Sequence, residues 1–238
     1  KMQAVLERVC ASTLSCIGVD GDESTSDMVL LMSTGAVSSA VDKDDFEEFE
    51  EKVGEVVAQL AHHLVRNGEG TNHVIRLSLS SDDLSRSDEK VLARNVLNGP
   101  LLKCAIAGND PNVGRLLQTL GQELGRLSRR RAEVDAQSLL SSALVQFGGE
   151  TIYERGNFQL DPEKEKRIEK HLRDAQLGPD TIGLPGETSG DNFPLHGKCV
   201  EIRIDLRADK NSPPSHPTVV LGSDLTHQYV TENADYRS

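Results

Sequence analysis

The sequence has few cysteines, and they are not paired. The four stand at positions 10, 16, 104 and 199, without the short spacing that a zinc site or a redox dithiol requires. None of the seven histidines lies in a helical H-x-x-x-H pattern that would hold zinc. We therefore expect free thiols in a reducing compartment and no metal site.

Positive charge is also scarce. Lysine and arginine number 26 against 38 acidic residues, which gives a net charge of -12. Such a charge repels phosphate backbones and anionic lipids. The single basic stretch, Arg129 to Arg131, has no aromatic neighbours on which bases could stack. We therefore expect neither a nucleic acid partner nor a membrane partner.

Long apolar runs are missing as well. No stretch is long enough to cross a bilayer, and the first residues lack the pattern of a secretory signal. No serine-hydrolase elbow or glycine-rich phosphate loop occurs. The sequence therefore predicts a soluble intracellular chain. Because Lys1 is followed at once by an amphipathic helical pattern without a capping residue, we expect the chain to be part of a longer protein.

Strand and helix patterns alternate along the chain. Residues 15–19 predict a strand, residues 20–22 a turn, and Met28 to Leu31 a helix that follows them. The clearest helix covers residues 44–67 and ends at Gly68. Further strands are expected at 75–79, 144–147, 151–153, 200–206 and 219–221, and further helices at 88–97, from 111, from 162 and at 224–232. This interleaving predicts an α/β protein of the layered α+β type.

The length allows one domain with a smaller second lobe. We expect two lobes at about residues 1–125 and 126–238. Residues 178–197 are rich in glycine, proline, aspartate and serine and have no periodicity. They predict a surface insertion.

Glu69 is the most informative single residue. It stands between Gly68 and Gly70 where the long helix ends, so its carboxylate can approach a ligand closely. The alternative interpretation is an exposed loop glutamate, which charged loop residues usually are. The polar tail, residues 233–238, would ordinarily be expected to fray.

Four segments, read in order, resemble the ornithine acetyltransferase (glutamate N-acetyltransferase) family. They are V-D-G-D-E-S-T-S-D-M-V-L-L at residues 19–31, V-R-N-G-E-G at 65–70, K-C-A-I-A-G-N-D-P-N-V-G-R at 103–115, and S-D-L-T-H-Q-Y-V-T-E-N-A-D-Y at 223–236. Each alone is a weak signal. Their common order and spacing make the resemblance specific.

The resemblance implies a precursor that cleaves itself before a threonine. The α and β chains would form an α2β2 heterotetramer, with sheets between helices in a fold similar to the N-terminal-nucleophile enzymes. The threonine would carry acetyl from N2-acetyl-L-ornithine to L-glutamate in arginine biosynthesis, without a cofactor, by covalent catalysis. This chain would be most of the β chain.

The resemblance also assigns residues. Glu69, Asn233 and Ser238 match positions that bind substrate, whereas the catalytic threonine is expected upstream of Lys1, so that no catalytic residue lies in this chain. Asp20, Asp22 and Asp27 are expected to fix a turn, and Asn109, Asp110 and Asn112 to cap a helix. Three positions depart from the family pattern, namely His73 for a lysine, Val113 for a tryptophan and Ser223 for a cysteine.

Two other functions remain open at this point. One is a related self-cleaving aminopeptidase or amidase, and the other is a catalytically inactive subunit that binds amino acids. The expected location is the cytoplasm of a bacterium, with a mitochondrial or plastid matrix as the alternative.

Overall fold

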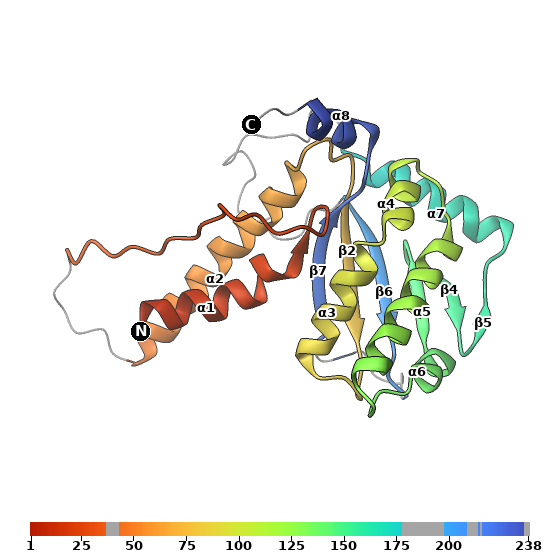
Figure 1. The fold of residues 1–238 in the computed structure, drawn as a ribbon, viewed down its shortest axis with the longest axis horizontal. Coiled ribbons are helices and arrows are strands. Elements are labelled where there is room, and N and C mark those ends of the chain that lie inside the picture. The colour runs from red at the N-terminus through yellow and green to blue at the C-terminus, as the bar shows by residue number, and fades with distance from the viewer. Residues whose placement is uncertain (37–42, 178–197, 209–213, 215, 236–238) are drawn as a thin grey trace.

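The described residues of the protein contain a central seven-stranded sheet (Figure 1). The computed structural model describes residues 1–36, 43–177, 198–208, 214 and 216–235. The strands are β1 (Ile17–Gly18), β2 (Val74–Ser80), β3 (Leu144–Phe147), β4 (Glu150–Glu154), β5 (Asn157–Phe158), β6 (Cys199–Asp205) and β7 (Thr218–Ser223). Their order across the sheet is β1-β7-β2-β6-β3-β4-β5.

The sheet mixes parallel and antiparallel pairs. Strand β2 runs parallel to β6 and antiparallel to β7, while the short edge strand β1 runs parallel to β7. On the other side, β3, β4 and β5 form an antiparallel meander beside β6. The sheet therefore takes strands from both sides of residue 125, and the division into two lobes stays a prediction. The expected insertion at residues 178–197 lies outside the described part of the chain.

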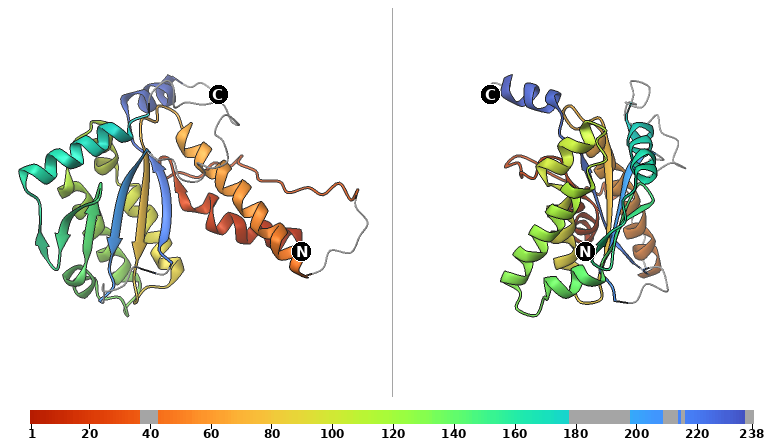
Figure 2. Two further views of the ribbon diagram at one scale, coloured as in Figure 1. Left: turned by 180° about the vertical axis from the view of Figure 1, so that it is seen from behind. Right: turned by 90° about the vertical axis from the view of Figure 1, so that its right-hand side faces the viewer.

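Helices cover both faces of the sheet. In Figure 2, α3, α4 and α5 lie on one face, and α2 and α7 lie on the other. Helix α1 packs beside α2 through a small cluster of buried side chains, Val5, Val9 and Val57. The helices are α1 (Met2–Ser12), α2 (Lys43–Arg66), α3 (Arg86–Leu97), α4 (Pro100–Ala107), α5 (Val113–Arg130), α6 (Ala136–Ser142), α7 (Pro162–Ala175) and α8 (His227–Asp235), with a 3-10 turn η1 (Leu14–Cys16). This arrangement confirms the layered α/β class.

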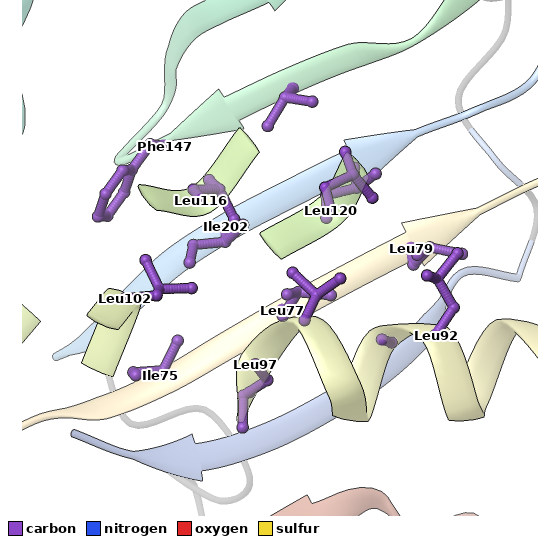
Figure 3. Close-up of a cluster of buried hydrophobic side chains, with 14 of the residues drawn as sticks. Ile75, Leu77, Leu79, Leu92, Leu97, Leu102, Leu116, Leu120, Phe147 and Ile202 are labelled. Carbon is purple, nitrogen blue, oxygen red and sulfur yellow. The ribbon is translucent and has the colours of Figure 1, made fainter. Parts of the chain in front are cut away.

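The main core lies between the sheet and α3 to α5. Ile75, Leu77 and Leu79 alternate along β2 and are fully buried against leucines of α3 and α5 (Figure 3). A strand places every second side chain on the same face, so the alternation in the sequence predicts this packing correctly. Burying such side chains contributes about 1.5–3 kcal/mol each.

Helix starts follow the capping signals in the sequence. Asp161 accepts hydrogen bonds from the backbone of Glu163 and Lys164 at 2.9 and 2.8 Å, and Pro162 opens α7 as predicted. Helix α5 begins two residues later than predicted, because Asn112 and not a residue before Pro111 is its cap. The strands predicted at 144–147 and 151–153 are confirmed as β3 and β4, which pair antiparallel.

The helix predicted at Met28 to Leu31 is wrong. Residues 23–36 form neither a helix nor a strand, and Met28 and Leu30 are exposed. Four consecutive apolar residues carry no helical period, so the pattern did not distinguish a helix from an extended segment. Only Leu31 packs, against the α1 and α2 cluster.

Candidate functional site

Glu69 lies in the tight loop between α2 and β2. Helix α2 ends where Gly68 N donates to Val65 O at 3.3 Å, and Thr71 N donates to Gly68 O at 3.0 Å to close the turn. Gly70 has a positive φ of 65°, which favours glycine. The loop therefore projects the exposed Glu69 side chain from the end of the helix.

Helix α8 brings Asn233 to Glu69. Thr226 donates its hydroxyl to Gly70 O at 2.7 Å and accepts Tyr229 N at 3.2 Å, which joins the start of α8 to the loop. One helical turn beyond Tyr229, Asn233 Nδ2 donates to Glu69 Oε2 at 2.7 Å. Two of the predicted site residues, 164 positions apart, thus meet. Ser238 lies outside the described residues.

Tyr229 connects α8 to the turn after β1. Its hydroxyl donates to Asp20 Oδ2 at 2.9 Å, while Asp20 Oδ1 accepts Asp22 N at 2.9 Å and shapes the turn as expected. Burial, the hydrogen bond to Asp20 and the nearby carboxylates of Asp22 and Glu69 raise the pKa of Tyr229 to about 12. These carboxylates make the site favourable for a cationic group.

Lys103 lies beneath this turn. Its side chain is buried in α4, and its Nζ donates to Gly18 O at 3.3 Å and to Val19 O. Burial lowers the pKa of Lys103 to about 8, although Asp20 and Asp224 act in the opposite direction. A buried charge is tolerated here because backbone carbonyls and carboxylates surround it.

His73 and Asp224 form a second buried polar contact. His73 Nδ1 lies 2.8 Å from Asp224 Oδ2, and His73 Nε2 lies 3.1 Å from Leu172 O. Both ring nitrogens thus lie within hydrogen-bond distance of an acceptor. The other oxygen of Asp224 accepts Asn72 N at 2.9 Å. His73 therefore keeps a polar partner for Asp224 where the family pattern has a lysine.

The structure also accommodates the other two departures from the family pattern. Val113 is buried in the first turn of α5, and Ser223 donates its hydroxyl to Val19 O at 3.1 Å. Neither substitution leaves a buried polar group of its own without a partner.

Sequence reasoning missed Tyr229, Lys103 and the pair of His73 with Asp224. Lys103 did carry a signal, since it is the one charged residue in the apolar run of residues 101–107. The expected capping by Asn112 is confirmed, because its Oδ1 accepts Arg115 N at 3.2 Å. The contact between Tyr229 and Asp20 had no local signal.

A groove of about 550 Å³ lies beside the site, between the end of α4 and the start of α8. Asn72 and Thr226 line it, and both belong to the segments that hold the Glu69 loop. Its size suits a small-molecule ligand.

Among the described residues, no group of His, Cys, Asp or Glu side chains is arranged to hold a metal ion. No helix in the described ranges has the length and apolarity needed to span a membrane.

Replacing Gly70 with alanine is expected to displace α8. A Cβ at this position would lie 2.8 Å from Thr226 Oγ1 and would meet the backbone nitrogen of Tyr229, at a φ of +65°. We expect Gly70→Ala to destabilise the protein by roughly 1–3 kcal/mol and to separate Asn233 from Glu69. Urea denaturation and hydrogen exchange of α8 in the full-length protein measure both effects.

Gly149→Ala is the matched control. Gly149 also has a positive φ, of +83°, but nothing lies within 4 Å of the added Cβ. It therefore shares the backbone strain without the clash. Equal effects of the two substitutions on α8 exchange would show that Gly70 matters only for backbone strain.

The pKa of Lys103 also predicts a pH dependence of stability. The folded protein loses this proton near pH 8, and the unfolded chain loses it near the ordinary lysine pKa of 10.5. Burial of the charged form thus costs stability below pH 8, and the cost is relieved as the pH rises to 10.5. The gain should be about 3 kcal/mol. Urea denaturation of the full-length protein at a series of pH values measures it.

Lys103→Met isolates this effect. Burial also raises the pKa of Cys199 to about 11, which lowers stability above pH 9 in parent and variant alike. The difference in unfolding free energy between the parent and Lys103→Met should therefore change by about 3 kcal/mol between pH 8 and pH 10.5. A difference that is constant with pH would contradict the lowered pKa of Lys103.

Comparison with known proteins identifies the family of the chain. All of it, residues 1–238, matches the sequence model of the ArgJ family. The chain belongs to the ArgJ family. It is 31% identical to "Arginine biosynthesis bifunctional protein ArgJ" of Zymomonas mobilis over 100% of this chain and 49% of that protein. It is 29% identical to "Glutamate N-acetyltransferase" of Methanopyrus kandleri over 100% of this chain and 52% of that protein.

A solved structure agrees with the fold. The crystal structure of ArgJ from Bacillus halodurans superimposes with a TM-score of 0.73 at 23% identity, over 99% of this chain and 92% of the matched chain. The chain thus spans about half the length of the curated ArgJ relatives but nearly all of the matched chain in the crystal structure.

Proposed function

We propose that this chain is the substrate-binding half of an acetyltransferase of arginine biosynthesis. The reaction transfers acetyl from N2-acetyl-L-ornithine to L-glutamate. The observation that carries the proposal is the 2.7 Å contact between Glu69 and Asn233, residues that the family resemblance assigns to substrate binding. Membership of the ArgJ family supports the same reaction class.

The reaction has two acyl transfers. In the first, a threonine hydroxyl contributed by the rest of the protein attacks the acetyl carbonyl of N-acetylornithine. The amine of ornithine leaves with the proton of that hydroxyl, and an acetyl ester remains on the threonine. In the second, the neutral amine of glutamate attacks the ester, which forms N-acetylglutamate and returns the proton to the threonine.

The described residues would bind and orient the substrate. The free side-chain ammonium group of N-acetylornithine suits Glu69, because a carboxylate makes charge-assisted hydrogen bonds with it. Asp20 and Asp22 add negative potential from the other side of Tyr229. Asn233 holds the Glu69 carboxylate in one orientation and leaves its other oxygen free to accept from the substrate.

The test is acetyl transfer from N-acetylornithine to glutamate by the full-length protein. Mass spectrometry of the intact protein with N-acetylornithine alone should show one acetyl group on a threonine. Hydrolysis of aminoacyl amides without transfer would favour the related amidase instead. A folded protein that binds ornithine but forms no acetyl ester would be the inactive subunit.

We further propose a partner chain from the same reading frame, as in an α2β2 assembly. Half of the curated relatives' length lies outside this chain. Outward-facing apolar residues repeat every four positions along α2 at Val56, Leu60 and Leu64, each more than 50% exposed. The extended run of residues 28–32 is also exposed at Met28, Leu30 and Met32. Apolar patches of this kind are typical of protein interfaces.

Negative charge on helix α2 should weaken its association with the other half of the protein. We expect the double variant Leu60→Asp and Leu64→Asp to reduce recovery of the other half of the protein at least tenfold in a co-purification. Val91→Asp is the control, since Val91 is an exposed apolar residue on α3, away from α2. Equal recovery with the α2 double variant and with Val91→Asp would argue against α2 as the interface.

A further inference from the structure

The turn that carries Asp20 has little support from the sheet. Strand β1 contains two residues, paired with Leu221 and Gly222 of β7 at the edge of the sheet. Beyond Gly18 the chain leaves the ladder, so strand pairing does not fix the position of Asp20. Other contacts must hold it.

Lys103 supplies these contacts. Its Nζ donates to the carbonyl oxygens of Gly18 and Val19, the residues directly before Asp20. Its own carbonyl accepts Leu225 N at 3.4 Å, from the loop that leads into α8. The residue is 2% exposed, so water cannot easily replace its hydrogen bonds.

From this turn a chain of contacts reaches the site. Asp20 accepts the hydroxyl of Tyr229 at 2.9 Å, and the carbonyl of Tyr229 accepts Asn233 Nδ2 at 3.0 Å. The same amide group donates to Glu69. The orientation of Asn233 at Glu69 thus depends on α8, and α8 is tied to Asp20.

We propose that Lys103 is a positioning residue of the Glu69 and Asn233 site. Its buried ammonium group holds the backbone of residues 18–19 so that Asp20 anchors Tyr229 and α8. Lys103 does not touch substrate in this role, and it acts through Asp20 and Tyr229. The kinetic part of the proposal rests on the acetyl transfer proposed above.

Lys103→Met tests this role in the full-length protein, because methionine fills similar space without a donor or a charge. The KM for N-acetylornithine should rise at least tenfold. Hydrogen exchange should become faster in residues 17–22 and 226–235 and stay unchanged in β2, β6 and α5. Lys170→Met is the control, since Lys170 is exposed on α7 and pairs with Asp174 on the same helix.

A double-mutant cycle with Tyr229→Phe separates positioning from general stability. If Lys103 acts through Tyr229, Lys103→Met should have at most a threefold effect on KM in the Tyr229→Phe background. Additive effects, an unchanged KM, or faster exchange throughout the sheet would overturn the proposal. Should Lys103→Met not fold, Ser223→Ala removes the other side-chain donor to Val19 O and should act in the same direction.

The two proposals can fail separately. If the full-length parent forms no acetyl product, the proposed acetyl transfer fails. The exchange rates of residues 17–22 and 226–235 then decide the role of Lys103 alone.

Discussion

Acetyl transfer by the full-length protein is expected to fall roughly 10- to 100-fold in kcat/KM when Glu69 is replaced by glutamine. Glutamine keeps an oxygen that can accept Asn233 Nδ2, so the variant removes the negative charge and preserves the contact. The loss should appear mainly in KM, because Glu69 binds the substrate ammonium group and does not take part in bond breaking. Steady-state kinetics with N-acetylornithine as the varied substrate measure it.

Asn233→Ala extends this test. Its effect should be smaller than that of Glu69→Gln, because it removes an orienting hydrogen bond and leaves the charge in place. The two effects should not add, since both residues form one contact. Glu232→Gln is the matched control, because this exposed carboxylate on α8 bonds to Gln228 and not to the site. A Glu69→Gln enzyme as active as Glu232→Gln would leave Glu69 as an ordinary loop residue.

Stability should fall by roughly 3–5 kcal/mol when Asp224 is replaced by alanine. Both side chains of the pair are 0% exposed, and the variant leaves the His73 ring and Asn72 N without their acceptor. It also removes a carboxylate that favours the charged form of Lys103. Urea denaturation of the full-length protein measures the loss, and the double variant with His73→Ala should lose less than the sum of the two.

His73→Lys distinguishes a requirement for a hydrogen-bond donor at Asp224 from a requirement for the ring. Lysine places a donor beside Asp224 and should be less destabilising than His73→Ala. The exposed pair of Lys170 and Asp174 is the reference, because such surface pairs contribute about 1 kcal/mol or less. If Asp224→Ala costs no more than Asp174→Ala, the buried pair does not stabilise the fold.

Local patterns were enough for much of the fold. The alternation of Ile75, Leu77 and Leu79 predicts β2 and its buried face, and Asp161 with Pro162 predicts the start of α7. Each of these signals acts between residues close in the chain, where geometry alone decides which side chains share a face. The start of α5 was missed by two residues because Asn109, Asp110 and Asn112 are all competent caps.

The site was predictable only in part. Glu69 and Asn233 were assigned by family resemblance, and the structure brings them into contact. The link from Lys103 through Asp20 to Tyr229 has no counterpart in local sequence, because it joins three distant segments. A lysine in an apolar helical run indicates only that its charge must find partners.

By itself, the sequence determined the family, the layered α/β class and the position of most helices and strands, because these depend on periodicity, capping and ordered motifs. The tertiary structure alone decided that residues 28–31 are extended, that β7 lies between β1 and β2, and that Asn233 reaches Glu69. The physical reason is that strand order and long-range hydrogen bonds arise from competition among many possible partners. Only the packed chain selects one of them.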